Sequence, residues 1–219
     1  MDSRTVTKHL KDAVFPLLRE YDFSSFTSRM AYRRQGDQTH IIALPSIGHH
    51  VASANQWSSH SFQVNLGVWL HYVPSMFQPV EKDGIPQINV FHCPVERSLN
   101  KTLVQPNTDP SSYVYYIGHN GEWLTEALAD VRKCIVQFAV PWFESISSDK
   151  SFFESPKSGS LTSSPDSPNA HLLLAYTAKR LGLGEQALAH LRAALDSGAF
   201  LDLKGVLEHD FNLWAETGA

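Results

Sequence analysis

The sequence has little cysteine and no long hydrophobic run. Cys93 and Cys134 are the only cysteines among 219 residues, whereas a secreted disulfide framework normally has more. No apolar stretch approaches the roughly 20 residues that span a bilayer, and the first residues form an amphipathic segment instead of an apolar signal region. These features predict a cytoplasmic protein with reduced thiols and no membrane partner.

Positive charge is also scarce. The 18 Lys and Arg residues are outnumbered by 22 Asp and Glu residues, so the formal net charge is -4. Arg33 and Arg34 form a pair, and no larger basic cluster is present. Proteins that bind phosphate backbones concentrate Lys and Arg on one surface. We therefore expect no nucleic-acid partner.

The motifs of the most easily recognised enzymes are missing. Neither GxGxxG nor GxxxxGK[ST] occurs, which removes the common nucleotide-binding loops. HExxH and CxxC are absent as well, and with them two common zinc-binding patterns. On this basis we expect no catalytic residues and no cofactor.

What is present is the apolar periodicity of an α+β fold. Apolar residues recur on one face of a helix over 6–21. Two strands within 26–44 flank a Gln35-Gly36-Asp37 turn, which predicts a hairpin. The strand 60–73 alternates apolar and polar side chains, so one of its faces is expected to be buried. Shorter strands are predicted over 87–93 and 111–118.

The strongest helix pattern covers residues 120–143. Its apolar stripe is Leu124, Leu128, Val131, Ile135, Phe138 and Trp142. A stripe of this length matches the apolar face of the strand 60–73. We therefore predict an antiparallel sheet packed on one face by helices, together forming an α+β domain over 1–146.

The last third of the sequence changes composition. Serine dominates 147–167, which predicts a linker. Beyond it, Ser167-Pro168 is typical of a helix start and Gly198 of a helix end. The segment 168–219 is therefore expected to form a helical unit, a hairpin plus a final helix.

Two resemblances accompany these predictions. The stretches "FQVNLGVWL", "CPVERSL" and "VPWFES", in that order after a hairpin, resemble the bacterial domain-of-unknown-function 4304 family over about residues 5–146. That resemblance implies an α+β fold and brings no established activity or site residues. "AHLLLAYTAKRLGLGEQALAHLRAAL" resembles a single tetratricopeptide unit, with packing residues at Leu174, Ala175, Gly182, Ala187 and Ala194. A single repeat cannot form a solenoid, so we expect a hairpin docked on its own α+β domain; a peptide-binding groove is the alternative.

The polar face of the strand 60–73 is the first candidate site. Gly67 leaves a dent beside Trp69, which suits close approach by a helix, another chain or a ligand. Two interpretations stay open: a polar face partly covered by the C-terminal helices, or a surface that binds a partner together with neighbouring loops. The partner-binding residues predicted on the second interpretation are Gln63, Asn65, Trp69, His71, His49, His50 and Trp57.

Histidines supply the main case for catalysis. Neutral imidazoles that converge at one sheet edge can bind zinc or a related metal, and the set that this would use is His49, His50, His60 and His71. Their spacing matches no established ligand pattern, so no metal is predicted. Glu96-Arg97 is a further candidate: an ion pair that holds a chain turn, or a binding carboxylate or guanidinium in a cleft.

Together these observations favour a non-catalytic cytoplasmic protein that works by binding another protein. Within that class we expect a bacterial immunity protein that neutralises a toxin by covering its active site, a task that suits small acidic α+β proteins. The alternatives are a metal-dependent hydrolase that uses the His49, His50, His60 and His71 region, and a small-ligand sensor with Trp69 in its pocket.

Overall fold

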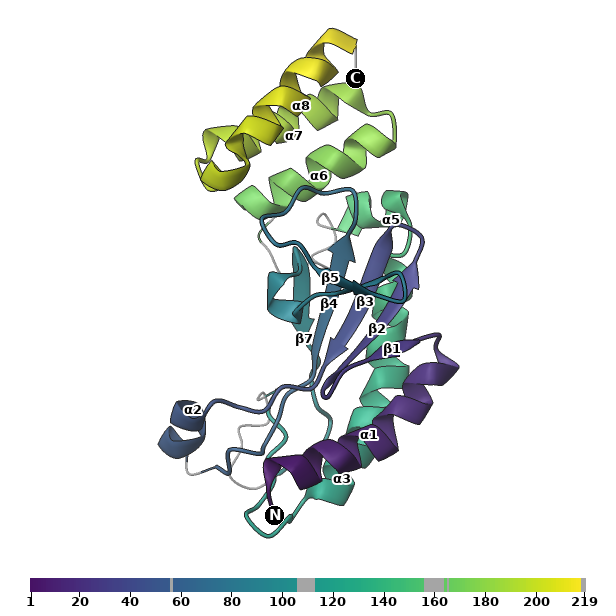
Figure 1. Ribbon diagram of the computed structural model, residues 1–219, viewed down its shortest axis with the longest axis vertical. Coiled ribbons are helices and arrows are strands. Elements are labelled where there is room, and N and C mark those ends of the chain that lie inside the picture. Colours follow the sequence, from purple (N-terminus) through teal and green to yellow (C-terminus); the bar gives the residue numbers. More distant parts are fainter. Residues whose placement is uncertain (56, 106–112, 156–163, 165, 218–219) are drawn as a thin grey trace.

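A five-stranded antiparallel sheet lies at the centre of the fold (Figure 1). The computed structural model describes residues 1–55, 57–105, 113–155, 164 and 166–217. In spatial order the strands are β1 (Ser25–Phe26), β2 (Met30–Gln35), β3 (Gln38–Ala43), β4 (Asn65–Leu70) and β7 (Val95–Ser98). Neighbouring strands all pair antiparallel. The predicted α+β class is confirmed.

Two tight hairpins follow from glycine in their turns. β2 and β3 pair up to Gln35 opposite Gln38, and Gly36 in the predicted turn has φ +58°. The second hairpin joins β5 (Val80–Lys82) to β6 (Ile85–Gln87) through Asp83 and Gly84, which both have positive φ. Consecutive positive φ values define the turn that Asp-Gly favours. The sequence analysis assigned no strand to this second segment.

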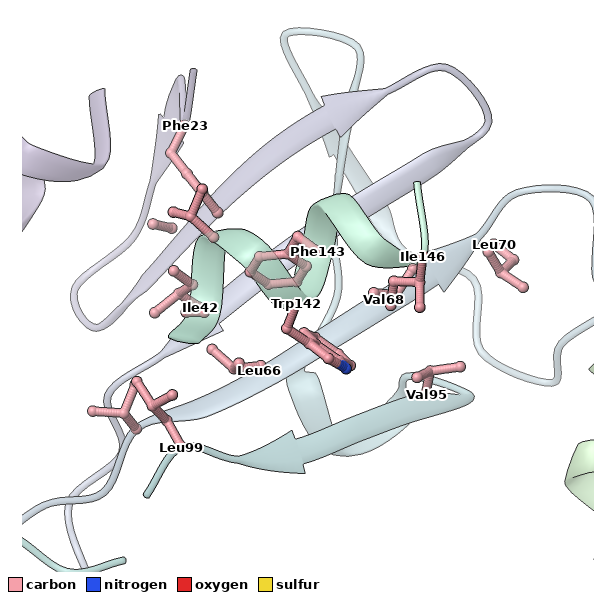
Figure 2. Close-up of a cluster of buried hydrophobic side chains, with 14 of the residues drawn as sticks. Phe23, Ile42, Leu66, Val68, Leu70, Val95, Leu99, Trp142, Phe143 and Ile146 are labelled. Carbon is pink, nitrogen blue, oxygen red and sulfur yellow. The ribbon is translucent and has the colours of Figure 1, made fainter. Parts of the chain in front are cut away.

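One face of the sheet is covered by helices. The helix α1 (Ser3–Glu20) continues through Pro16 and packs on α3 (Leu124–Cys134). The chain continues from α3 without a break into the π-helix η2 (Ile135–Ala139) and into α4 (Val140–Ser145). Figure 2 shows Trp142 and Phe143 lying over Leu66 and Val68 of β4. The expected packing of this helix on the apolar face of the strand is therefore confirmed.

The π-helix changes which side chains of that helix are buried. Phe138, predicted in the apolar stripe, is 48% exposed, whereas its neighbour Ala139 is fully buried. A π turn adds one residue to the helix, so the positions after it are rotated relative to those before it. Phe143 is buried there in addition to Trp142 of the predicted stripe. Pro141 also lacks the N–H that a regular α-helix would direct four residues back. Leu128, on the same predicted stripe, is only half-buried.

The opposite face of the sheet is also covered, which corrects the prediction of a polar surface there. The β5–β6 hairpin and the 3-10 helix η1 (Val90–His92) lie over it. They build a second core cluster, which consists of Tyr32, Ile41, Ala43, Trp69, Ile85, Ile88, Val90 and Cys93. The cover is formed by residues of the α+β part and not by the C-terminal helices. Side chains that alternate along β4 therefore enter two different buried layers, one on each face of the sheet.

Gly67 permits the close approach of η1. The sequence analysis had expected such a close approach, because glycine has no side chain. A Cβ atom at position 67 would lie 2.8 Å from Cys93 Sγ and 2.8 Å from Val90 Cγ2. We expect Gly67→Ala to lower the free energy of unfolding by about 1–3 kcal/mol, because η1 must move to relieve the overlap. Gly48→Ala is the control, since nothing lies within 4 Å of a Cβ there. Equal urea midpoints for the two variants would contradict this packing.

Two predicted strands are not formed as such. The segment 87–93 contributes only Gln87 to a strand and then turns into η1. Within 111–118, residues 111–112 lie outside the described part, and Tyr115 makes an isolated bridge to Phe62. The short helix α2 (His49–Ala54) lies in the loop between β3 and β4.

The C-terminal helices follow the predicted pattern. α6 (Pro168–Arg180) begins after Ser167, whose side chain accepts a hydrogen bond from the backbone of Ala170. α7 (Gly184–Asp196) ends before Gly198, which has φ +67°. The 3-10 helix η4 (Leu201–Leu203) leads into α8 (Lys204–Thr217). The five packing residues of the tetratricopeptide resemblance include four buried side chains and the turn glycine Gly182.

The predicted linker 147–167 is partly folded. α5 (Asp149–Glu154) starts with a capping box formed by Ser148 and Ser151. Its Phe152 and Phe153 are buried in the main core, which explains why a serine-rich segment forms a helix here. Residues 156–163 and 165, also in the predicted linker, lie outside the described residues.

The helical unit docks on the end of the sheet through α6. Arg180 forms ion pairs of 2.8 Å with Asp37 in the β2–β3 turn and 2.8 Å with Asp149 of α5. Its guanidinium carbon lies 4.4 Å from the centre of the Tyr72 ring, and the Tyr72 hydroxyl lies 3.3 Å from Thr177 Oγ1. Buried side chains of both parts belong to one continuous cluster. The hairpin is thus docked on its own α+β part.

Candidate functional site

The sheet residues of the predicted partner surface are largely buried. Asn65 accepts a hydrogen bond from Ser98 Oγ at 3.1 Å, and Trp69 is only 7% exposed. His71 lies 2.8 Å from Thr39 Oγ1, and burial lowers the pKa of its imidazole. Gln63 is half-buried. Because β5, β6 and η1 cover this face, Asn65 and Trp69 are buried and Gln63 and His71 are only partly accessible.

The loop residues of the same prediction lie elsewhere. His49 and His50 are exposed on α2, at the opposite end of the molecule from the C-terminal helices (Figure 1). Trp57 is half-buried against a small cluster around Ile47 and Ala52. The structure therefore separates the seven predicted residues instead of bringing them together.

The histidines proposed for a hydrolase do not converge either. His60 is buried, with its Nε2 3.2 Å from the carbonyl oxygen of Gly118. It precedes β4, whereas His71 follows the other end of that strand. Within the described ranges, no group of three or more His, Cys, Asp or Glu side chains is placed to hold a metal ion. The geometry gives the hydrolase alternative no support.

A pocket of about 250 Å³ lies where the sheet meets the C-terminal helices, and we call it the junction pocket. Its lining comes from the end of β4 (Trp69, Leu70), the loop 73–77, residues 91–94 and the C-terminal helices (Asn169, Leu172, Leu173, Phe200, Leu203). Figure 1 shows the loop after β4 passing beside α6. An engineered cavity of roughly 150 Å³ accommodates benzene, so the pocket has room for one apolar side chain or a small ring.

The rim of the junction pocket exposes large apolar side chains. Phe91 is 60% exposed, and Met76 and Phe77 are about half-exposed. The Phe77 ring lies 3.8 Å from the ring of His92, centroid to centroid, and its backbone N–H donates to Ser75 Oγ. These contacts hold Phe77 at the rim although its surface remains accessible. The sequence analysis missed Met76 and Phe77 because they lie outside any periodic pattern, and Phe91 because it falls in the predicted strand 87–93, which forms η1 instead.

The inner wall of the junction pocket is apolar, and its cysteine is not a reactive thiolate. Trp69 and Cys93 line it from the second core cluster. Burial, with a smaller contribution from Glu96, raises the pKa of the Cys93 thiol, so this group stays protonated at neutral pH. His92 packs on Phe77, on the rim. The arrangement is suited to binding by apolar contact.

A buried polar network on the helix side of the sheet has a structural role. Arg33 Nη2 lies 2.9 Å from His40 Nδ1, and because a guanidinium only donates, Nδ1 must accept. The His40 proton is therefore on Nε2, which donates to Gln38 Oε1 at 3.0 Å. Gln38 in turn donates to the carbonyl oxygen of Ile146 at 3.1 Å. The network ties the end of α4 to the sheet.

Comparisons of the chain with protein-family models, with curated proteins and with solved structures found no match. The resemblances to the domain-of-unknown-function 4304 family and to a tetratricopeptide unit therefore stay predictions from the sequence. Among the described residues, no helix combines the length and the hydrophobicity needed to cross a membrane.

Proposed function

We propose that this protein acts by binding another protein, and that the partner inserts an apolar side chain into the junction pocket. The exposed apolar rim carries this proposal: Met76, Phe77 and Phe91 surround a pocket with an apolar inner wall. Aromatic and Met side chains are enriched in interfaces, and contiguous exposed apolar surface marks interaction sites.

The three rim side chains keep much apolar surface exposed, which a partner can bury on binding. A few central side chains usually carry most of the binding free energy, and truncation of one of them costs about 2 kcal/mol or more. Phe91 is the most exposed of the three rim residues, so it is expected to gain most on binding. Because it is exposed in the free protein, Phe91→Ser should leave the stability nearly unchanged.

Affinity capture with three immobilised proteins tests the proposal. The wild type and Leu213→Ser, which removes an exposed apolar side chain on α8 outside the pocket, should retain the same partner. Phe91→Ser should lose it. With the purified partner, the dissociation constant for Phe91→Ser should rise at least about tenfold. A partner that binds all three proteins with equal affinity would exclude the junction pocket as its site.

Within this class we propose a toxin as the partner, which the protein would neutralise by covering the toxin's active site. The net charge of -4 supports this choice, because an acidic surface attracts a basic one during encounter. A tight complex with the product of a neighbouring toxin gene would support the proposal. If the gene for this protein instead lies in a metabolic operon with no toxin gene nearby, the proposal of a toxin partner would be contradicted.

A small apolar ligand is a second candidate for the same pocket, favoured by Trp69 in its lining. Short-chain fatty acids that enter the pocket should change the fluorescence of Trp69 and raise the midpoint of thermal unfolding. Trp69→Phe should remove the fluorescence change and leave the thermal shift. If neither changes at millimolar ligand, the pocket does not act as a small-ligand sensor for these compounds.

A further inference from the structure

A second concave surface lies between the edge strand β7 and the helix that carries the π turn. It has a volume of about 450 Å³ and shares no lining residue with the junction pocket. β4 supplies Leu66, β7 and the residue after it supply Arg97 and Leu99, and the helix supplies Phe138 and Trp142. We call it the β7 groove. The π turn forms one wall of it, because it directs Phe138 to the surface.

The strand beside the groove is an edge of the sheet. β7 pairs with β4 on one side, and no described strand pairs with its other side. The backbone N–H of Leu99 donates to Val64, so by alternation the N–H of Ser98 points away from β4. An edge of this kind is a template for an added strand.

Arg97 gives the groove its charge. Among the described residues, it is the only charged one in the lining and takes part in none of the ion pairs. Its guanidinium carbon lies 5.6 Å from the ring centre of Trp142, within the range of a cation–π contact. The ion pair with Glu96 that the sequence suggested is not formed, because neighbouring strand residues point to opposite faces. Arg97 instead lies in a cleft, as the alternative prediction had it.

We propose that the β7 groove binds an extended peptide segment of a partner protein, which adds a strand to β7. Strand addition supplies affinity through backbone hydrogen bonds and specificity through alternate side chains. Arg97 and Leu99 are two residues apart and face the helix side. A peptide strand beside β7 therefore presents two side chains, also two residues apart, to the groove. The matching pattern is an acidic residue opposite Arg97 and a large apolar residue beside Leu99 and Phe138.

A labelled, capped peptide of the form Thr-Thr-Phe-Thr-Glu-Thr-Thr is the probe, because an added strand that runs antiparallel to β7, as the other strands of the sheet pair, then places Glu opposite Arg97 and Phe opposite Leu99. Fluorescence anisotropy on the full chain is the measurement. A second peptide carries lysine in place of the glutamate, and a third carries serine in place of the phenylalanine. We expect the first peptide to bind at least about tenfold more tightly than either control, because only it satisfies both the charge and the apolar wall. Binding that does not depend on these residues, or no binding at millimolar peptide, would overturn the proposal.

Variants of β7 separate strand addition from simple charge attraction. Ser98→Pro removes the outward N–H but leaves the ladder with β4, so it should abolish binding, whereas Ser98→Ala should retain it. Arg97→Gln should weaken binding of the glutamate peptide about tenfold, with Arg4→Gln as the matched control for a distant guanidinium. Circular dichroism checks that each variant folds. If Ser98→Pro does not fold, the peptide affinity of Arg97→Gln alone tests the proposal. Unchanged binding by both variants, or self-association of the wild type through β7, would show another use of this edge.

Loss of this binding is distinguishable from failure of the junction pocket. Phe91→Ser should leave the peptide affinity unchanged, since Phe91 does not line the β7 groove. A loss of peptide binding in Phe91→Ser would place the peptide in the junction pocket and contradict the assignment to β7.

Discussion

Replacing Phe143 by alanine is expected to lower the free energy of unfolding by about 3–5 kcal/mol, the usual cost for a buried phenylalanine. Phe143 is fully buried and stacks on the His40 ring at 4.6 Å between centroids. Phe138→Ala, five residues earlier on the same helix, is expected to cost less than about 1 kcal/mol, because Phe138 is half-exposed. Chemical unfolding of the two variants beside the wild type measures both values.

This pair of variants tests the π turn itself. A regular α-helix with the apolar stripe predicted from the sequence would bury Phe138 and make its replacement costly. Equal losses of stability for Phe138→Ala and Phe143→Ala would therefore contradict the shifted helix. The expected difference also bears on the β7 groove, which needs Phe138 at the surface.

The second large effect is a loss of stability in mild acid that originates at His40. Burial, and then the charge of Arg33, lower the pKa of His40 from 6.5 to about 3. Below pH 6.5 the unfolded chain binds a proton at this position that the folded protein excludes. The stabilisation is thus complete above pH 6.5 and is lost as the pH falls towards 3. Between pH 7 and pH 5 the loss is about 2 kcal/mol.

The variant His40→Gln isolates this contribution. Glutamine keeps an acceptor and a donor but does not titrate in this range. The variant should be less stable than the wild type at pH 7.5, and the difference between the two proteins should shrink by about 2 kcal/mol at pH 5. Other histidines and carboxylates titrate in both proteins and cancel in the comparison. A difference that stays constant with pH would show that His40 is accessible to protons in the folded state.

The elements with regular patterns could be predicted from the sequence. The β2–β3 hairpin, the strand β4 and the caps at Ser167 and Gly198 follow from local rules for turns, alternation and helix ends. The π turn could not be predicted, because an apolar stripe that includes Phe138 fits a regular helix as well. Pro141 was the one local indication of an irregularity.

The candidate site was harder to predict, because a polar side chain in the sequence is not always an exposed one in the structure. Asn65 is buried with its side-chain oxygen bonded to Ser98 Oγ, and Trp69 is covered by a hairpin in a segment for which no strand was predicted. The Asp83-Gly84 turn of that hairpin could have been recognised. The rim residue Phe91 could not, because its exposure depends on where η1 docks and not on its neighbours in sequence.

The proposed function is tested most directly by locating the partner on the molecule. Hydrogen–deuterium exchange of the full chain, with and without the purified partner, reports which backbone amides the complex protects. The junction pocket predicts protection over 73–77 and 91–94, the two segments that form its rim. Protection confined to α2, around His49 and His50, with the junction pocket unchanged, would contradict it.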